Sequence, residues 1–210
     1  RWVTSNVGGT VETLFVHPGS VVQANSPLLQ LSNPAVLQQL RRAQLALSRT
    51  NAQAAAQKAQ LQDQLYAMEG NLASAKAKSA SAEMRVKADV SLLKEAVISR
   101  LQYETDHLNA QNDAALVASL VRQIAAFRRN AAAQAQGEQS LVASAQADLV
   151  SAQENVRALK PLAGMTGEVL TVSVQAGQSL AAGAAMAQIA NVHKLDAVLA
   201  VSPDDAGETA

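Results

Sequence analysis

Two stretches of the chain alternate apolar and polar residues in short runs that turn residues interrupt. The first is GGTVETLFVHPGSVVQANSPLLQLSN at residues 8–33, and the second is TGEVLTVSVQAGQSLAAGAAMAQIAN at residues 166–191. When the first is moved by 158 positions, eight of the 25 residues from Gly9 to Asn33 are identical to their counterparts. Short alternating runs between turn signals are typical of half-buried β-strands. Because an isolated hairpin is marginal in water, we expect the two copies to face each other as one small β-sandwich.

Glycines divide both copies into strands. Pro18 and Gly19 fit the two central positions of a type II turn, and Gly177 keeps a glycine at the matching place in the second copy. Gly9 and Gly167 open the two copies in the same way. We expect these four to be β-turn glycines, because a turn with positive φ is relaxed only for glycine.

The stretch between the copies lacks the residues that end helices. Residues 35–159 contain no proline, and Gly70 and Gly137 are the interior glycines, so we expect helix throughout. Apolar residues recur at steps of three and four, which predicts a coiled-coil seam. One stripe comprises Leu37, Leu40, Leu47, Ala54, Leu61, Leu65, Met68, Leu72, Ala75, Ala82, Val86, Leu93 and Ala96, and another comprises Val142, Ala145, Leu149, Ala152, Val156 and Leu159.

A single helix of this length would hold the two β copies far apart, so the pattern favours an antiparallel hairpin. The β-branched run AVIS at residues 96–99 is the best turn, and it leaves about 60 residues, or about 90 Å of helix, on each side. Polar residues interrupt the first stripe at Gln44, Asn51, Lys58, Ser79 and Asp89. Of these, Gln44, Asn51 and Asp89 either set the helix register or are simply solvated in a thin two-helix contact.

Composition narrows the class of function. The formal net charge is zero and no arginine-rich run occurs, which argues against a nucleic-acid partner. Two Phe, two Tyr and one Trp can fill only a thin core, and the absence of cysteine excludes disulfides and thiolate metal sites. No run of 18 apolar residues occurs. Because the sequence starts at Arg1 inside a strand-like run, we expect an internal piece of a longer protein, with room upstream for either a signal peptide or a membrane anchor.

Candidate catalytic residues form no pattern of their own. His17, His107 and His193 fall in a turn, a helix and a strand edge, so no pair has the spacing of metal ligands. The acidic pair Asp204 and Asp205 is typical of a polar loop. No nucleophile elbow or phosphate-binding glycine loop is present. We therefore expect neither an enzyme nor a metal site.

A lipoyl or biotinyl carrier needs a lysine at the hairpin that joins the two halves of its β-domain. In this chain the helical insertion occupies that junction, and LSNPAV contains no lysine. Lys58 lies well inside the helix, and Lys160 precedes Pro161 without a flanking aspartate or methionine. We therefore expect no attached cofactor.

Two β-sandwich halves around an antiparallel coiled coil resemble the periplasmic adaptor subunits called membrane fusion proteins, or hemolysin D-type adaptors. The likeness is carried by VGGTVETLFVHPGSVVQANSPLLQLSNP (7–34) and PLAGMTGEVLTVSVQAGQSL (161–180), which look like the two halves of that family's lipoyl-like domain. VHKLDAVLAVSP (192–203) looks like the first strand of the following β-barrel domain. The implied fold is α+β, a lipoyl-like β-sandwich split by an α-helical coiled-coil hairpin. The implied divisions are 1–34, 35–159, 160–192 and 193–210, the last being the start of the β-barrel.

The resemblance implies a non-enzymatic transport role. Such adaptors link an inner-membrane transporter to an outer-membrane channel for efflux or secretion, and they assemble with copies of themselves into rings, with a hexamer as the family expectation. They lie in the periplasm, and we expect a segment outside this chain to anchor the protein to the inner membrane. The alternative is a structural coiled-coil interaction module of a surface or secretion assembly.

The resemblance also implies docking residues at the hairpin tip. In the drug-efflux branch the tip carries an arginine, a leucine four residues later and a serine seven after that. Leu92 and Ser99 keep the leucine-to-serine spacing, and Tyr103 and Glu104 continue the pattern, but Ala88 occupies the arginine position. Ser99 can equally be a helix N-cap, because its hydroxyl accepts a backbone N–H.

Overall fold

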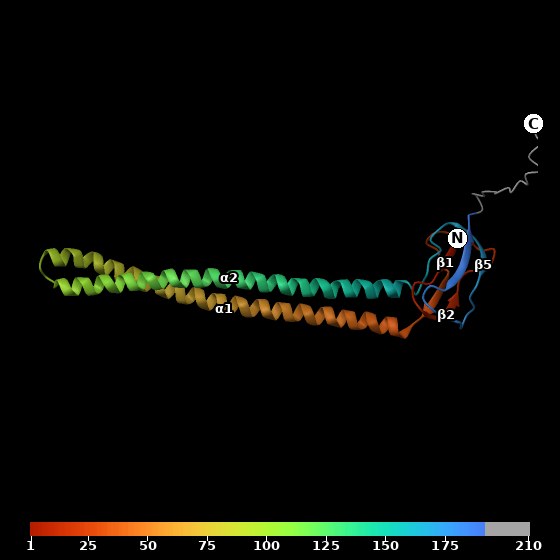
Figure 1. The fold of residues 1–210 in the computed structure, drawn as a ribbon, viewed down its shortest axis with the longest axis horizontal. Helices are drawn as coiled ribbons and strands as arrows, with labels where there is room; N and C mark the ends of the chain where they lie inside the picture. Colours follow the sequence, from red (N-terminus) through yellow and green to blue (C-terminus); the bar gives the residue numbers. More distant parts are fainter. Residues whose placement is uncertain (192–210) are drawn as a thin grey trace, which may run out of the picture. The chain divides into compact units, whose positions relative to one another are not determined.

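The computed structural model describes residues 1–191, so the predicted start of a β-barrel at 193–210 lies outside the described residues. Two compact units are present: a sandwich unit, Arg1–Gln44 with the chain from Ala147 onward, and a hairpin unit, Leu45–Gln146. Helix α1 spans Pro34–Lys94 and α2 spans Arg100–Arg157. The predicted β-sandwich interrupted by an antiparallel helical hairpin is confirmed (Figure 1).

The sandwich unit consists of two antiparallel sheets. The first sheet has four strands in the order β1 (Trp2–Thr4), β7 (Ala185–Ala190), β5 (Gly167–Val172) and β3 (Val21–Val22). The second has three, in the order β4 (Leu29–Ser32), β2 (Gly9–Leu14) and β6 (Ser179–Leu180). Each sheet therefore contains strands from both sequence copies, which is why neither copy forms a sheet alone.

The two copies obey an approximate two-fold symmetry that reaches further than their sequence identity. The amide of Val11 donates to the Gln178 carbonyl at 2.9 Å, and 158 residues away the amide of Val169 donates to the Ser20 carbonyl at the same distance. The symmetry continues upstream, because Ile189 N–H donates to Arg1 and Leu31 N–H donates to Leu159. Residues 1–7 and 159–165 share no identical residue at this offset. Each structural repeat thus covers residues 1–33 or 159–191.

The sandwich core is thin and aliphatic, as the composition predicted. Two clusters of buried side chains fill it, and each cluster draws on both repeats. One comprises Val11, Leu29, Leu31, Leu159, Val174, Leu180 and Met186, and the other comprises Val16, Val22, Leu28, Ala163, Val169, Ala187 and Ile189. Burial of these side chains at about 25 cal/mol per Å² of apolar surface is the main force that holds the two sheets together.

Two of the four expected turn glycines are strand residues. Gly19 and Gly177 have φ of 88° and 83°, but Gly9 and Gly167 are the first residues of β2 and β5. A β-carbon added to Gly9 would lie 2.9 Å from the Ser32 carbonyl oxygen, and one added to Gly167 would lie 2.3 Å from the Ala190 carbonyl oxygen. Glycine is therefore needed at these two positions because neighbouring backbone passes too closely for a side chain.

The seam of α1 follows the predicted step of three and four with one shift of phase. Its half-buried or buried positions are Leu40, Ala43, Leu47, Thr50, Ala54, Gln57, Leu61, Leu65, Met68, Leu72, Ala75, Ser79, Ala82, Val86, Asp89 and Leu93. Two four-residue steps follow one another at Gln57, Leu61 and Leu65, which locally relaxes a left-handed supercoil. Before Leu61, the seam keeps the predicted Leu40, Leu47 and Ala54, but its alternate positions lie one residue earlier than expected. Gln44, Asn51 and Lys58 consequently lie outside the seam and are exposed, which is the solvated alternative for Gln44 and Asn51.

Ion pairs join the two arms of the hairpin unit. Lys78 Nζ lies 2.8 Å from Asp113 Oδ1, and an Arg128 guanidinium nitrogen lies 2.7 Å from Glu69 Oε1. The earlier α1 residue, Glu69, pairs with the later α2 residue, Arg128, as two antiparallel helices require.

Candidate functional site: the tip of the helical hairpin

The tip begins with a left-handed cap at the end of α1. Ala96 has φ of 57°, its amide donates to the Leu93 carbonyl at 3.1 Å, and the Val97 amide donates to the Leu92 carbonyl at 2.9 Å. These two bonds satisfy carbonyls that the helix end would leave without partners. Glycine normally occupies such a left-handed position, so this turn is held with alanine at some cost in free energy.

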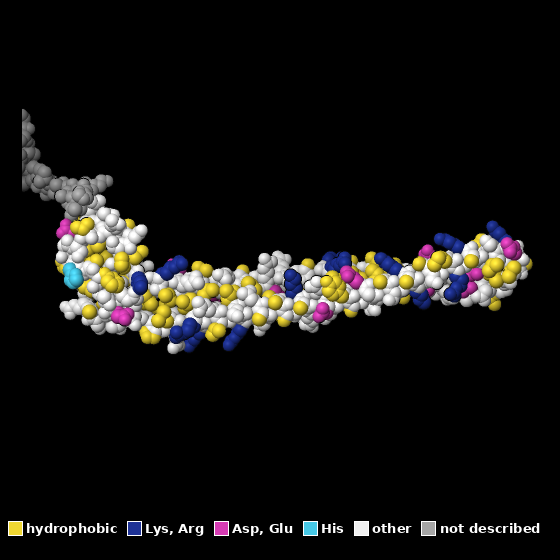
Figure 2. All heavy atoms as spheres, turned by 180° about the vertical axis from the view of Figure 1, so that it is seen from behind, with side chains coloured by type: hydrophobic (Ala, Val, Ile, Leu, Met, Phe, Trp, Pro, Cys, Tyr) yellow, Lys and Arg dark blue, Asp and Glu magenta, His cyan; other side chains and the backbone are white. Residues whose placement is uncertain are grey.

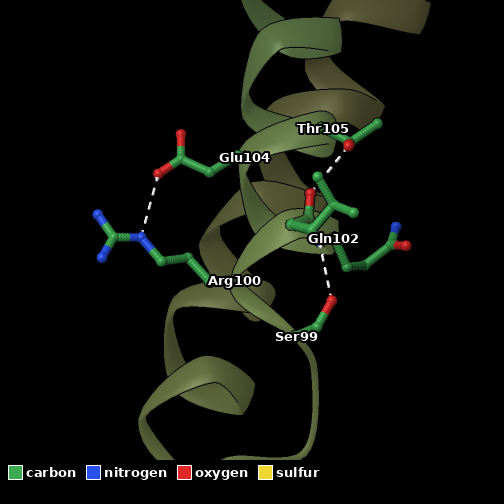
Figure 3. Close-up of polar contacts among 6 residues, drawn as sticks. Ser99, Arg100, Gln102, Glu104 and Thr105 are labelled. Carbon is green, nitrogen blue, oxygen red and sulfur yellow. Dashed lines mark hydrogen bonds and ion pairs between the residues drawn. The ribbon is translucent and has the colours of Figure 1, made fainter.

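Ser99 starts the second arm as the N-cap of α2. Its hydroxyl oxygen accepts the Gln102 backbone N–H at 3.1 Å (Figure 3). Its carbonyl accepts the Tyr103 N–H at 3.2 Å. The Gln102 side chain donates to Asp106 Oδ2 at 2.6 Å. The capping interpretation of Ser99 is confirmed, and an additional docking role stays a prediction.

The remaining predicted docking residues lie along the first turns of α2. Tyr103 is half-buried and stacks on the His107 ring with centroids 5.9 Å apart. Glu104 is exposed, and its carboxylate lies 3.7 Å from the Arg100 guanidinium (Figure 3). An exposed ion pair of this kind contributes little stability. Breaking it would therefore cost little free energy if either side chain formed an ion pair with another molecule.

Exposed apolar side chains at the tip were missed by the sequence analysis. Val97, Leu101 and Leu108 are 65%, 77% and 56% exposed, and we call these three the tip surface. Leu92, by contrast, is half-buried. The sequence did hold a signal, since Leu101 and Leu108 are seven residues apart and lie outside the seam frame of Tyr103 and Ala110. Figure 2 shows hydrophobic and charged side chains of both signs together along the hairpin.

A buried carboxylate interrupts the seam close to the tip. Asp89 is 7% exposed, and within the described part of the chain its Oδ2 atom has no hydrogen-bond partner. One helical turn earlier a polar hollow of about 560 Å³ opens between the arms, lined by Lys78, Arg85, Asp106 and Asp113 among others. The polar seam position at Asp89 is thus shielded from solvent, although the adjacent groove is lined by charges.

Neither a cluster of metal ligands nor a helix able to cross a membrane occurs in residues 1–191. No group of three or more His, Cys, Asp or Glu side chains could hold a metal ion among them. None of the described helices combines the length and apolarity that a membrane crossing requires. An apolar groove of about 440 Å³ lies where the seam changes phase, lined by Ala54, Leu61, Ala131, Ala135 and Val142 together with flanking polar residues.

This architecture is similar to that of several solved structures. The structure of the periplasmic adaptor protein EmrA is similar over 91% of this chain and 71% of that chain, with a TM-score of 0.52 and 13% sequence identity. The described chain has the fold of a periplasmic adaptor protein. The crystal structure of MacA from Actinobacillus actinomycetemcomitans is similar to this adaptor fold over 92% of this chain and 49% of that chain, with a TM-score of 0.52 and 17% identity.

No protein-family model and no curated protein sequence matches the chain. At 13% and 17% identity the structural likeness establishes the adaptor fold. The chain spans about half of the MacA structure, so the activity and partners of the whole protein belong to a proposal.

Proposed function

We propose that this chain is part of a periplasmic adaptor that links an inner-membrane transporter to an outer-membrane channel in efflux or secretion. The observation that carries the proposal is the fold shared with the periplasmic adaptor protein EmrA over 91% of the chain. The role is mechanical and non-enzymatic: the transporter supplies the energy, and the adaptor holds the two membrane proteins in line. The protein works in the periplasm, and a segment outside this chain anchors it to the inner membrane.

The proposal also covers self-assembly of the protein and the role of each part of the chain. Several copies form a ring, for which six is the number that the family resemblance implies. Residues 1–34 and 160–192 are the two halves of a lipoyl-like domain, residues 35–159 are the docking hairpin, and residues 193–210 begin a β-barrel domain.

The hairpin tip is the proposed docking site for the channel. The tip surface of Val97, Leu101 and Leu108 offers apolar area that no other described residue covers, and burying it against a partner would be favourable. In this proposal Glu104 and Tyr103 contact the channel beside the tip surface. Ser99 and Leu92 contribute chiefly by fixing the turn, because the Ser99 hydroxyl and the Leu92 carbonyl already accept backbone hydrogen bonds.

Export by the full-length protein tests the docking role. We expect Leu101→Lys to lower export at least tenfold while the protein stays folded, because a side chain that is 77% exposed packs against little else. Leu116→Lys is the matched control, since Leu116 lies further along the same helix and is 48% exposed. Its export should be unchanged.

Photo-crosslinking in cells from positions 97 and 101 identifies the partner. Capture of an outer-membrane channel would support the adaptor role. Normal export by Leu101→Lys together with no channel capture would contradict it. Capture of copies of the same protein alone would favour a structural coiled-coil module.

A further inference from the structure

The two-fold symmetry of the sandwich unit provides an internal comparison for every surface residue. Core positions agree between the repeats: Val11 matches Val169 and Leu31 matches Ile189, and all four are at most 1% exposed. Because both repeats build the same strands and turns, their outward residues need not differ for folding. A difference at matched outer positions therefore points to a use other than stability.

At three exposed outer positions the first sheet carries an apolar residue where the second carries a polar one. Trp2, Leu170 and Val21 lie on β1, β5 and β3, and they are 50%, 46% and 82% exposed. Their counterparts 158 residues away on the second sheet are Lys160, Glu12 and Ser179, which are also exposed. The reverse holds at Phe15 and Leu162, which follow β2 and Pro161, are 49% and 50% exposed, and match the exposed Ser173 and Thr4.

Two of these three apolar residues lie on strands at the edges of the first sheet. Strands β1 and β3 are its outermost strands, and each pairs with one neighbour among the described residues. Natural proteins commonly protect edge strands with lysine or proline. The second sheet follows this rule, because Lys160 and Pro161 occupy the segment that pairs with the outer side of β4. At the same two places the first sheet has Trp2 and Val3, so its edges are limited only by the shortness of β1 and β3, which have three and two residues.

The two edge strands of the first sheet, β1 and β3, are complementary to each other. The pairs β1–β7, β7–β5 and β5–β3 are all antiparallel, so β1 and β3 run in opposite directions. Placing β1 of one copy beside β3 of another would therefore continue the antiparallel sheet. It would also bring Trp2 next to Val21 on the same outer face, where both would lose contact with water.

We propose that β1 of one copy of this chain pairs with β3 of the next copy, with Trp2 packed against Val21. The occupant is a second copy because the chain itself carries both halves of the contact. A contact between two different edges is head-to-tail, so it can repeat and close into a ring. The inference rests on the proposed function, to which it adds the surface through which the ring assembles.

Cysteine crosslinking tests the pairing directly, because this chain contains no cysteine of its own. Full-length protein carrying Trp2→Cys is mixed with full-length protein carrying Val21→Cys, and a short bismaleimide is added. A crosslinked dimer should form in the mixture and not with either variant alone. The matched control is Lys160→Cys mixed with Ser179→Cys, the equivalent pair on the second sheet, which should give at least tenfold less dimer.

A second pair of variants separates assembly from folding. Trp2→Lys and Val21→Ser introduce the residues that the second sheet already carries at the equivalent places, so the fold should tolerate them. Each should lower self-association at least tenfold by sedimentation or light scattering, with an unchanged circular dichroism spectrum. Unchanged self-association in both variants would overturn the proposal.

The crosslinking outcomes also distinguish this inference from the proposed function. When both cysteines react with a maleimide probe, absence of the mixed dimer overturns the edge pairing. Dimers formed by one variant alone indicate a symmetric contact and overturn it as well. If the mixed dimer is absent while the hairpin tip captures a channel, the adaptor function stands without this ring surface. If the mixed dimer forms and no channel is captured, the edge pairing stands and the channel-docking role does not.

Discussion

Replacing Asp89 should stabilise the hairpin, which is unusual for a change at a buried position. The Asp89 side chain is 7% exposed, and its Oδ2 atom has no partner within residues 1–191. An unsatisfied buried acceptor costs about 1–3 kcal/mol, and a buried leucine side chain gains about 1.5–3 kcal/mol over an exposed one. Because a two-helix seam buries less than a globular core, we expect Asp89→Leu to raise the free energy of unfolding by about 2–4 kcal/mol. Asp89→Asn, which removes the charge and replaces one acceptor oxygen with an amide NH2 donor, should raise it by about 1 kcal/mol.

Urea unfolding followed by circular dichroism at 222 nm measures this effect, because the signal comes mainly from α1 and α2. Asp113→Asn is the control of opposite sign. Its carboxylate is also largely buried, but it accepts a bond from Lys78 at 2.8 Å, so its loss should lower stability by up to about 1 kcal/mol. A lower unfolding midpoint for both Asp89 variants would refute the reasoning, since it would mean that the Asp89 carboxylate makes a favourable interaction in the folded protein.

Two further predictions concern backbone conformation, and thermal unfolding checks both. Ala96→Gly should stabilise the hairpin by about 0.5–1 kcal/mol, because Ala96 holds a φ of 57° that glycine adopts without strain; a destabilised variant would contradict the left-handed cap. Gly167→Ala should destabilise the sandwich by more than about 2 kcal/mol, because the new β-carbon would lie 2.3 Å from the Ala190 carbonyl oxygen. Gly70→Ala is its control: Gly70 is inside α1 with open space around it, so the change should stabilise by about 0.5–1 kcal/mol, and equal effects at both glycines would show that close approach is not the cause.

The repeat and the hairpin could be predicted because both depend on patterns that one sequence displays. Buried positions in the two repeats must be apolar, so identities such as Val11 with Val169 survive at a fixed offset. The seam needs an apolar residue every three or four positions, and this was visible over most of α1. Its alternate positions before Leu61 were not predictable, because small or polar residues such as Ala43, Thr50 and Gln57 do not mark a seam by their hydrophobicity.

The first strand of each repeat could not be predicted from identity. Residues 1–7 and 159–165 pair with equivalent strands through their backbones, and a backbone hydrogen bond does not depend on the side chain. At these edges the side chains can differ without loss of the pairing, as Trp2 and Lys160 differ. Sequence comparison therefore loses the repeat where backbone hydrogen bonds alone hold the strands.

The tip illustrates a related limit on reading function from spacing. The seven-residue interval between Leu92 and Ser99 has a structural cause in this protein. The Leu92 carbonyl accepts the Val97 amide in the cap of α1, and the Ser99 hydroxyl caps α2. A tight turn between two helices produces that interval whether or not a partner binds. The exposed side chains of Val97 and Leu101 have no such structural duty. Loss of docking on their replacement would therefore report on the partner contact itself, whereas loss on replacing Ser99 would mix that contact with the stability of the turn.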